Sequence, residues 1–187
     1  MLMLVKGITD EDFVNYKLPS MFIATATCSF KCDKEYGSSI CQNSALAKQP
    51  SIDIPISNII DRYLENPITH AIVLGGLEPL DQLNDVLDLL DYLRLYPAYR
   101  YDRHYIPEPR DHPKANDPFV IYTGYTKEEI YDKFITVAGY TFDEFTNMIY
   151  GNIIIKYGRY IPGQQPHFDP VLGVNLASDN QYAERIS

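Results

Sequence analysis

The chain has 187 residues, of which 45% are hydrophobic, and its formal net charge is −9. A chain of this length buries a substantial core, so we expect one domain over residues 1–187. The negative charge argues against a general affinity for nucleic acid or anionic lipid, and no apolar run approaches the roughly 18 residues of a membrane-spanning helix. The first residues turn acidic before a secretory signal could form, so we expect a cytoplasmic protein.

Strand and helix patterns alternate along the first half of the chain. Residues 21–27 form a short apolar run with β-branched side chains, typical of a buried strand. Residues 57–64 then place apolar side chains on one helical face. Residues 70–74 form another apolar run, which two glycines stop, and residues 81–93 repeat the helical spacing.

The same alternation resumes in the second half of the chain. Residues 119–122 and 153–156 have strand character. The S/T-x-x-E pattern of a capping box occurs at residues 126–129 and 141–144, and predicts a helix start at each place, the first at Lys127. Repeated strand and helix with short connections indicates an α/β fold with a mostly parallel sheet, in which ligands bind at the carboxyl ends of the strands.

Two segments depart from this pattern. Residues 96–118 contain five prolines over a length that ordinary connections seldom reach, so we expect an insertion there, either a surface loop or a lid or partner-contacting arm. The tail from Gly158 is rich in Gly, Pro, Gln and Asn and has little helix or strand signal. We expect it to lie across the surface.

The three cysteines of the chain, Cys28, Cys32 and Cys41, follow directly after the first predicted strand. Thiolates at close spacing suit an iron–sulfur cluster or zinc, and three of them leave one coordination position for another ligand. An odd number of cysteines without an export signal argues against a disulfide framework. The residues alone allow a four-iron cluster, a zinc site completed by a histidine, or buried thiols, but all four histidines lie far from the cysteines in sequence.

Two further predicted strands end in residues suited to binding. In LGGLEPL, the glycines at 75 and 76 let a ligand approach the backbone, and Glu78 can accept hydrogen bonds from an ammonium group. In IYTGYT, residues 123–125 combine hydroxyl groups with a glycine. Each motif alone is also typical of a simple turn. Lys156 and Arg159, near the fourth strand end, are either solvent-exposed or available to a carboxylate.

Together these motifs resemble the radical S-adenosylmethionine enzymes, and within them the activating proteins of anaerobic ribonucleoside-triphosphate reductase. CSFKCDKEYGSSIC resembles the cluster-binding segment, GGLEPL the Gly-Gly-Glu element, IYTGYTKEEI the third strand and helix start, and IIIKYGRYI the fourth strand. The ending LASDNQYAERIS is similar to the Ser-x-Asn-Gln tail of these activases. The resemblance covers residues 22–187 apart from 96–118, and implies a partial (β/α) barrel.

The resemblance also implies a site and a reaction. Cys28, Cys32 and Cys41 would hold a 4Fe-4S cluster, whose fourth iron binds S-adenosyl-L-methionine. The implied binding residues for that cosubstrate are Ile40, Gly75, Gly76, Glu78, Thr123, Gly124 and Tyr125. An external one-electron donor such as flavodoxin or ferredoxin would reduce the cluster, and the radical formed from the cosubstrate would generate a glycyl radical on a partner, anaerobic ribonucleotide reductase.

Three features differ from the family pattern. The cysteine spacing is C-x3-C-x8-C instead of C-x3-C-x2-C, so six extra residues must loop out, at a small cost in loop-closure entropy. Ile40 stands where relatives often have an aromatic residue, and Ile153 where many have an acid, so Ile153 receives no role. The alternatives are a radical enzyme acting on another peptide or a small molecule, and a zinc-stabilised binding module.

Overall fold

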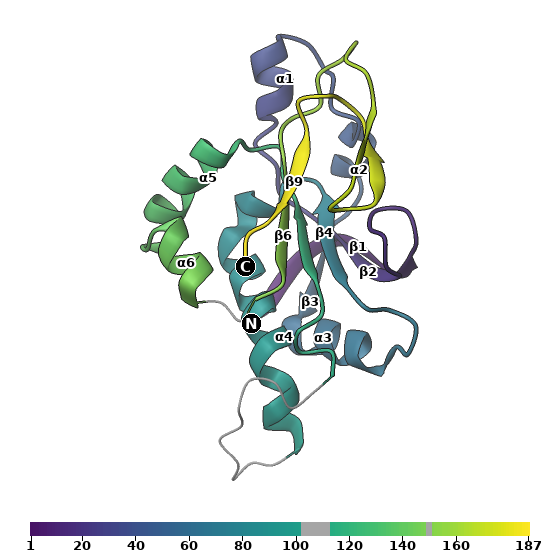
Figure 1. Cartoon of the computed structure of the whole chain (residues 1–187), viewed down its shortest axis with the longest axis vertical. Helices are drawn as coiled ribbons and strands as arrows, with labels where there is room; N and C mark the ends of the chain where they lie inside the picture. Colours follow the sequence, from purple (N-terminus) through teal and green to yellow (C-terminus); the bar gives the residue numbers. More distant parts are fainter. Residues whose placement is uncertain (102–112, 149–150) are drawn as a thin grey trace.

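A seven-stranded sheet forms the centre of the fold, in the order β3-β1-β2-β4-β5-β6-β9 (Figure 1). It is seen in a computed structural model that describes residues 1–101, 113–148 and 151–187. The strands are β1 (Leu2–Asp12), β2 (Ser20–Thr25), β3 (Ile52–Pro55), β4 (Ile72–Gly76), β5 (Phe119–Tyr122), β6 (Ile153–Tyr157) and β9 (Tyr182–Arg185). Neighbours among β2, β4, β5 and β6 pair in parallel, whereas β1 and β9 run antiparallel to the strands beside them. The expected single α/β domain with a mostly parallel sheet is confirmed.

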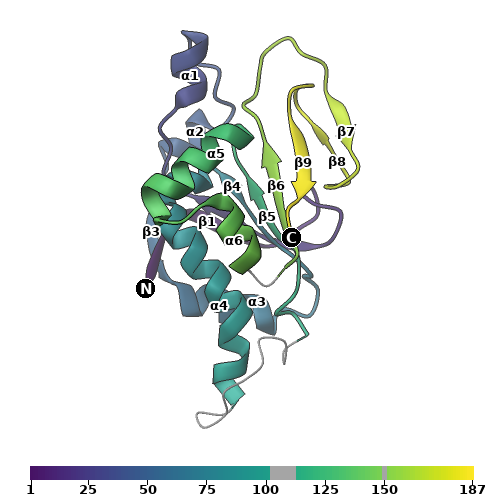
Figure 2. The same ribbon diagram turned by 60° about the vertical axis from the view of Figure 1, so that its left-hand side comes forward.

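Helices and a hairpin cover opposite faces of this sheet. The helical segments are α1 (Lys31–Tyr36), α2 (Ser44–Ala47), α3 (Ile56–Glu65), the 3₁₀ turn η1 (Pro79–Gln82), α4 (Leu83–Tyr101), α5 (Lys127–Lys133), the π-helical turn η2 (Phe134–Ala138) and α6 (Phe142–Met148). The hairpin consists of β7 (His167–Asp169) and β8 (Val174–Leu176). Figure 2 shows α3, α4, α5 and α6 on one side of the sheet and the hairpin on the other.

The parallel strands are apolar on both faces because both faces are buried. In β4, Ile72 and Leu74 join the core beneath the helices, whereas Val73 joins the core beneath the hairpin. The neighbouring strand β5 alternates in the same way, with Phe119 on the helix side and Val120 on the hairpin side. Successive side chains of a strand point to opposite faces, so a strand covered on both faces reads as a continuous apolar run. This explains why the sequence predicted these strands correctly.

The tail contains strands that the sequence analysis did not predict. Asp169 fixes their arrangement, since its Oδ1 accepts the N–H groups of Val171 and Leu172 and its Oδ2 accepts that of Ala183, each at 2.9 Å. The weak strand signal after Gly158 thus did not reveal β7, β8 and β9. Strands of three or four residues are too short to show a clear alternation.

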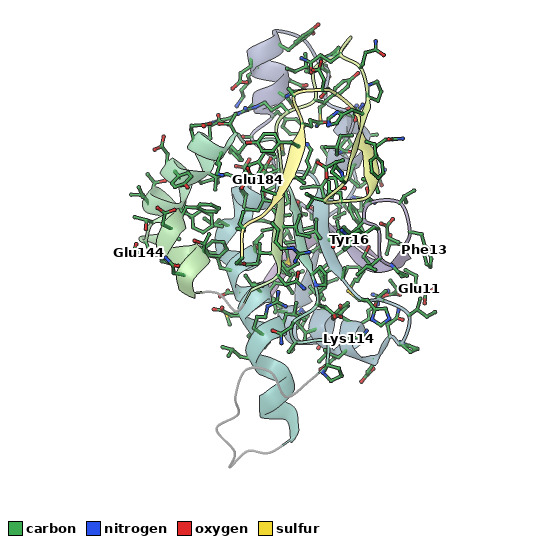
Figure 3. The ribbon with its side chains drawn as sticks, viewed as in Figure 1. Glu11, Phe13, Tyr16, Lys114, Glu144 and Glu184 are labelled. Atoms are coloured by element: carbon green, nitrogen blue, oxygen red, sulfur yellow. The ribbon has the colours of Figure 1, made fainter. Side chains whose placement is uncertain are left out.

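Two strands near the N-terminus were also missed, because no element was predicted over β1 or β3. In β1 only part of one face is buried, so its apolar residues mix with charged ones. The connection after β1 returns under the hairpin: Phe13 is exposed and points outward, whereas Tyr16 is buried in the core beneath the hairpin (Figure 3).

The proline-rich segment expected to be an insertion is structured at both of its described ends. Helix α4 continues to Tyr101, and residues 102–112 lie outside the described residues. On the other side, Lys114 and Ala115 are buried near the end of α3 (Figure 3). Arg94, fully buried in α4, donates to the carbonyl oxygens of Ala115, Asp117 and Gly151. This flank of the segment is therefore part of the core.

The described part of the sheet is open. Its outer strands are β3 and β9, and they do not pair with each other. In the described ranges, no helix combines the length and the apolar character needed to cross a membrane.

Candidate functional site

A cavity of about 460 Å³ lies at the carboxyl ends of the parallel strands. This is the edge where α/β sheets commonly bind ligands. It brings together segments that are far apart in the sequence, because parallel strands present their exit loops at the same edge. All ten predicted site residues line it: Cys28, Cys32, Ile40, Cys41, Gly75, Gly76, Glu78, Thr123, Gly124 and Tyr125.

Side chains from η1 hold the loop that leaves β2 and carries Cys28. Gln82 Oε1 accepts the Ala26 N–H at 3.0 Å and the Thr27 hydroxyl at 3.1 Å. Asp81 Oδ2 accepts the Ser29 N–H at 2.6 Å. Cys28 is thus fixed from both sides, which gives its thiol a defined direction at the cavity.

Cys32 lies in the short helix α1 at the upper end of the molecule (Figure 1). None of the side chains of α1 is buried, so apolar packing does not hold the helix. Ion pairs do so instead: Lys31 pairs with Glu129 at 3.1 Å, and Arg159 pairs with Glu129 at 2.7 Å and with Glu35 at 3.3 Å. The helix that carries Cys32 is therefore attached to α5 and to the loop after β6 by charge.

The pKa of Glu129 reflects this arrangement. Burial acts to raise it, but hydrogen bonds from Arg159, from the Thr126 N–H and from Lys31 lower the pKa of Glu129 to about 2. The carboxylate stays ionised at neutral pH. The capping box predicted at Thr126 and Glu129 is present, so the same glutamate also starts α5.

The three cysteines are free thiols around the shared cavity. Burial, together with the nearby charges of Glu78 and Asp81, raises the pKa of Cys28 to about 11. Burial and the neighbouring Cys41, which is within hydrogen-bonding reach, raise the pKa of Cys32 to about 11. Such thiols are protonated at neutral pH, and a metal centre that binds them must displace those protons.

The described side chains do not form a ready-made site for a single metal ion. One zinc ion needs its ligands around one point at about 2.0–2.3 Å. Within the described ranges, no three His, Cys, Asp or Glu side chains are arranged in that way. In a four-iron cluster each thiolate binds its own iron, so the thiolates lie farther apart. Of the histidines, His70 and His167 do not line the cavity, and His104 and His112 lie outside the described residues.

The two glycines at the end of β4 lie at a closely packed place. A Cβ atom at Gly75 would lie 3.0 Å from the ring of Phe22. Gly76 has a φ of +80°, and a Cβ atom there would lie 3.0 Å from Ala24. The glycines therefore let β4 pass close to β2, and they also keep the cavity wall free of side chains at this place.

Glu78 joins the ends of β4 and β5. Its Oε1 accepts the Thr123 hydroxyl at 2.6 Å and the Leu80 N–H at 3.1 Å, and its Oε2 accepts the Gly124 N–H at 2.8 Å. Burial raises the pKa of Glu78 to about 7, although these hydrogen bonds oppose the rise. A carboxylate has about four acceptor positions, so one position on Oε2 remains for a donor in the cavity.

Tyr125 closes one side of the cavity, and its ring lies among three cations. The charged groups of Lys133, Lys31 and Arg159 lie 4.7, 4.8 and 5.8 Å from the ring centroid. The Tyr125 hydroxyl donates to Asp81 Oδ1 at 2.5 Å, and Lys133 pairs with the same oxygen at 2.8 Å. These contacts fix the ring beside the cysteine loop.

The tail forms another wall of the cavity. Gly158, with a φ of +91°, offers its carbonyl oxygen to the Lys156 ammonium at 2.7 Å and to the Gln181 side chain at 3.2 Å. Burial lowers the pKa of Lys156 to about 8, with Glu78 acting against the decrease. The sequence analysis left Lys156 between a solvent-exposed and a carboxylate-binding role, and the structure buries it at the cavity.

Sequence reasoning missed the residues that support the site. Asp81, Gln82 and Glu129 position the cysteine segments but belong to helix starts, where acids and amides are ordinary. The cavity also includes residues from unpredicted parts of the fold, namely Asn15, Asn43, Leu46, Asn175, Leu176 and Ala177. Comparison of the chain with protein-family models, curated proteins and solved structures finds no significant match.

Proposed function

We propose that this protein is a radical S-adenosylmethionine activase. Its open sheet would be the partial (β/α) barrel of that family, with the helices outside and the cavity at the carboxyl ends of the strands. The observation that carries the proposal is the convergence of three thiols, the Gly75-Gly76 turn and Glu78 on one cavity. The sequence motifs predicted this convergence from residues up to 50 positions apart, Cys28 and Glu78.

The proposed site divides into two parts. Cys28, Cys32 and Cys41 would hold a 4Fe-4S cluster, which supplies the electron for cleavage of S-adenosyl-L-methionine when both are bound. Glu78 would accept a hydrogen bond from the amino group of the cosubstrate through the free position on Oε2, beside the exposed backbone of Gly76.

The remaining walls would orient the cosubstrate and exclude water. Ile40, Thr123, Gly124 and Tyr125 line the cavity and would surround the nucleoside. Ile40 packs against a base but does not stack on it as an aromatic ring does. Exclusion of water matters because a carbon radical abstracts hydrogen from any group within reach.

The partner would be a glycyl radical enzyme, of which anaerobic ribonucleotide reductase is the candidate that the sequence resemblance favours. A flavodoxin or ferredoxin would be the electron donor. A cavity open to the surface suits a substrate segment that belongs to another protein and completes the wall when it binds.

Anaerobic reconstitution tests this proposal. The protein is loaded with iron and sulfide, reduced, mixed with S-adenosyl-L-methionine, and assayed chromatographically for 5′-deoxyadenosine. We expect the product with the parent protein, and none with Cys28→Ala, Cys32→Ala or Cys41→Ala. The exposed Lys34→Ala variant serves as the control within the same helix. Product formation by Cys41→Ala at the parent level would refute the assignment of the third ligand, and purification with zinc instead of iron would favour the binding-module alternative.

A second assay identifies the partner. Electron paramagnetic resonance of an anaerobic ribonucleotide reductase mixed with the loaded protein should show a glycyl radical. Cleavage of the cosubstrate without such a radical would favour a different peptide or a small molecule as substrate.

A further inference from the structure

Asp33 links the second and third cysteines through one oxygen atom. Its Oδ1 accepts the backbone N–H of Ile40 at 2.9 Å and that of Cys41 at 2.8 Å. The Cys32 thiol, 3.8 Å away, donates to the same oxygen. A single carboxylate oxygen therefore contacts both ends of the eight-residue stretch that separates the two cysteines.

The path of the chain between these cysteines depends on few other contacts. Helix α1 ends at Gly37, which has a φ of 74° and donates its N–H to the Asp33 carbonyl oxygen at 3.0 Å. This left-handed residue reverses the chain. Residues 34–39 are all exposed, so apolar burial does not hold the returning segment. After Cys41, the side chain of Asn43 donates to the carbonyl oxygen of Gly76 and anchors the next segment.

We propose that Asp33 is a positioning residue, which closes the long loop and holds Cys41 beside Cys32 at the cavity. A flexible loop of this length brings its ends together at small entropic cost, but it leaves them in many relative orientations. Two hydrogen bonds to consecutive backbone N–H groups select one of them. The purpose of this closure rests on the proposed function, whereas the closure itself is a property of the metal-free protein.

The closure is tested by trapping the two thiols as a disulfide. In a Cys28→Ser background only Cys32 and Cys41 remain, and diamide takes up the two electrons and two protons that the thiols release as the disulfide forms. Peptide mass analysis at successive times gives the rate at which the disulfide between Cys32 and Cys41 forms. We expect Asp33→Ala to slow it about tenfold, because the effective concentration of one thiol at the other falls. Asp33→Asn retains an oxygen acceptor, so we expect a rate within about threefold of the parent.

Asp33→Ala and Asp33→Asn both remove the negative charge beside Cys32, but only Asp33→Asn keeps an oxygen acceptor. A difference between their rates of disulfide formation therefore reports the hydrogen bonds and not the charge. Lys34→Ala, at the exposed neighbouring position, should match the parent. Thermal unfolding verifies that each variant is folded, and Asp33→Ser provides a second truncation. A rate for Asp33→Ala equal to the parent rate would overturn the proposal, as would an equally slow rate for Asp33→Asn.

Iron binding distinguishes this proposal from the proposed function. With all three cysteines present, we expect reconstituted Asp33→Ala to lose iron to a chelator about tenfold faster than the parent, because the third ligand is less ordered. A parent protein that takes up no iron would refute the proposed function, and the disulfide rates would still decide the role of Asp33. A parent that binds iron while the disulfide rates do not differ would refute only the role of Asp33.

Discussion

The carboxylate of Glu78 and the hydroxyl of Thr123 are hydrogen-bonded across 2.6 Å, and this contact joins the loop after β4 to the end of β5. The same carboxylate accepts the N–H of Gly124. Glu78 is therefore both a wall of the cavity and a link between two strand ends, so its substitution affects stability as well as binding.

Glu78→Ala should lower the free energy of unfolding by about 2–3 kcal/mol, because it leaves the buried Thr123 hydroxyl and the N–H groups of Leu80 and Gly124 without their acceptor. Urea unfolding of the metal-free protein measures the loss. Glu128→Ala, at an exposed position of α5, is the control and should leave the stability close to that of the parent. Equal stability of Glu78→Ala and the parent would show that the hydrogen bonds of Glu78 do not stabilise the fold.

Glu78 also predicts a pH dependence of stability. Burial raises its folded-state pKa from 4.5 to about 7, so between these values the folded state retains a proton that the unfolded state releases. The contribution of Glu78 to the free energy of unfolding is therefore fully present below pH 4.5. It decreases by up to about 3 kcal/mol as the pH rises through the folded-state pKa of about 7. Denaturation at several pH values should show a steeper decrease for the parent than for Glu78→Gln. Parallel profiles would contradict this prediction.

Arg94 should be among the most costly residues to truncate. Its side chain is fully buried and donates to three backbone carbonyl oxygens. Arg94→Ala would leave these oxygens without their donor and would leave an empty space where the arginine side chain packs. We expect a loss of about 3 kcal/mol or more in unfolding free energy, measured by denaturant titration. Arg62→Ala removes an exposed ion pair with Asp10 and should cost less than about 1 kcal/mol. Similar losses for the two variants would count against a structural role for Arg94.

Asp169 should control the order of the tail. Asp169→Ala removes the acceptor for three backbone N–H groups, at Val171, Leu172 and Ala183. We expect hydrogen exchange of residues 171–185 to become at least about tenfold faster, while the amides of β4 and β5 keep their protection. Asp169→Asn retains the oxygen for the first two contacts and should give an intermediate effect. Uniform acceleration over the whole chain would indicate global unfolding instead.

Cys28 should be a slow nucleophile in the metal-free protein. Burial raises its pKa to about 11 from an ordinary value of 9.0, so little thiolate is present at neutral pH. In a Cys32→Ser, Cys41→Ser background, alkylation by iodoacetamide should be about tenfold slower or more than for an unfolded control in urea. Equal rates in the folded and unfolded states would show that the thiol is freely exposed.

The sequence was sufficient to predict the elements that are buried on both faces. β4 and β5 read as strands because burial on both sides selects apolar residues throughout. The helix starts at Lys127 and Phe142 were predictable because a capping box is a local signal. Long-range pairing left no comparable signal. β9 joins β6 through backbone hydrogen bonds, to which side-chain patterns contribute little.

The cavity was predictable for a topological reason. Parallel strands with short connections place their exit loops on one edge, so motifs at three strand ends had to lie near one another. The contacts that orient these motifs were not predictable. The link between Lys31 and Glu129, for example, joins residues 98 positions apart and depends on how α1 and α5 sit on the sheet.

Helix α1 is attached by ion pairs and buries none of its own side chains, and this makes its position responsive to dissolved salt. At about 0.1 M electrolyte the Debye length is about 10 Å, and it shortens to about 3 Å at 1 M. Concentrated potassium chloride should thus loosen the segment that presents Cys32 while the apolar core, which does not depend on charge, keeps its structure.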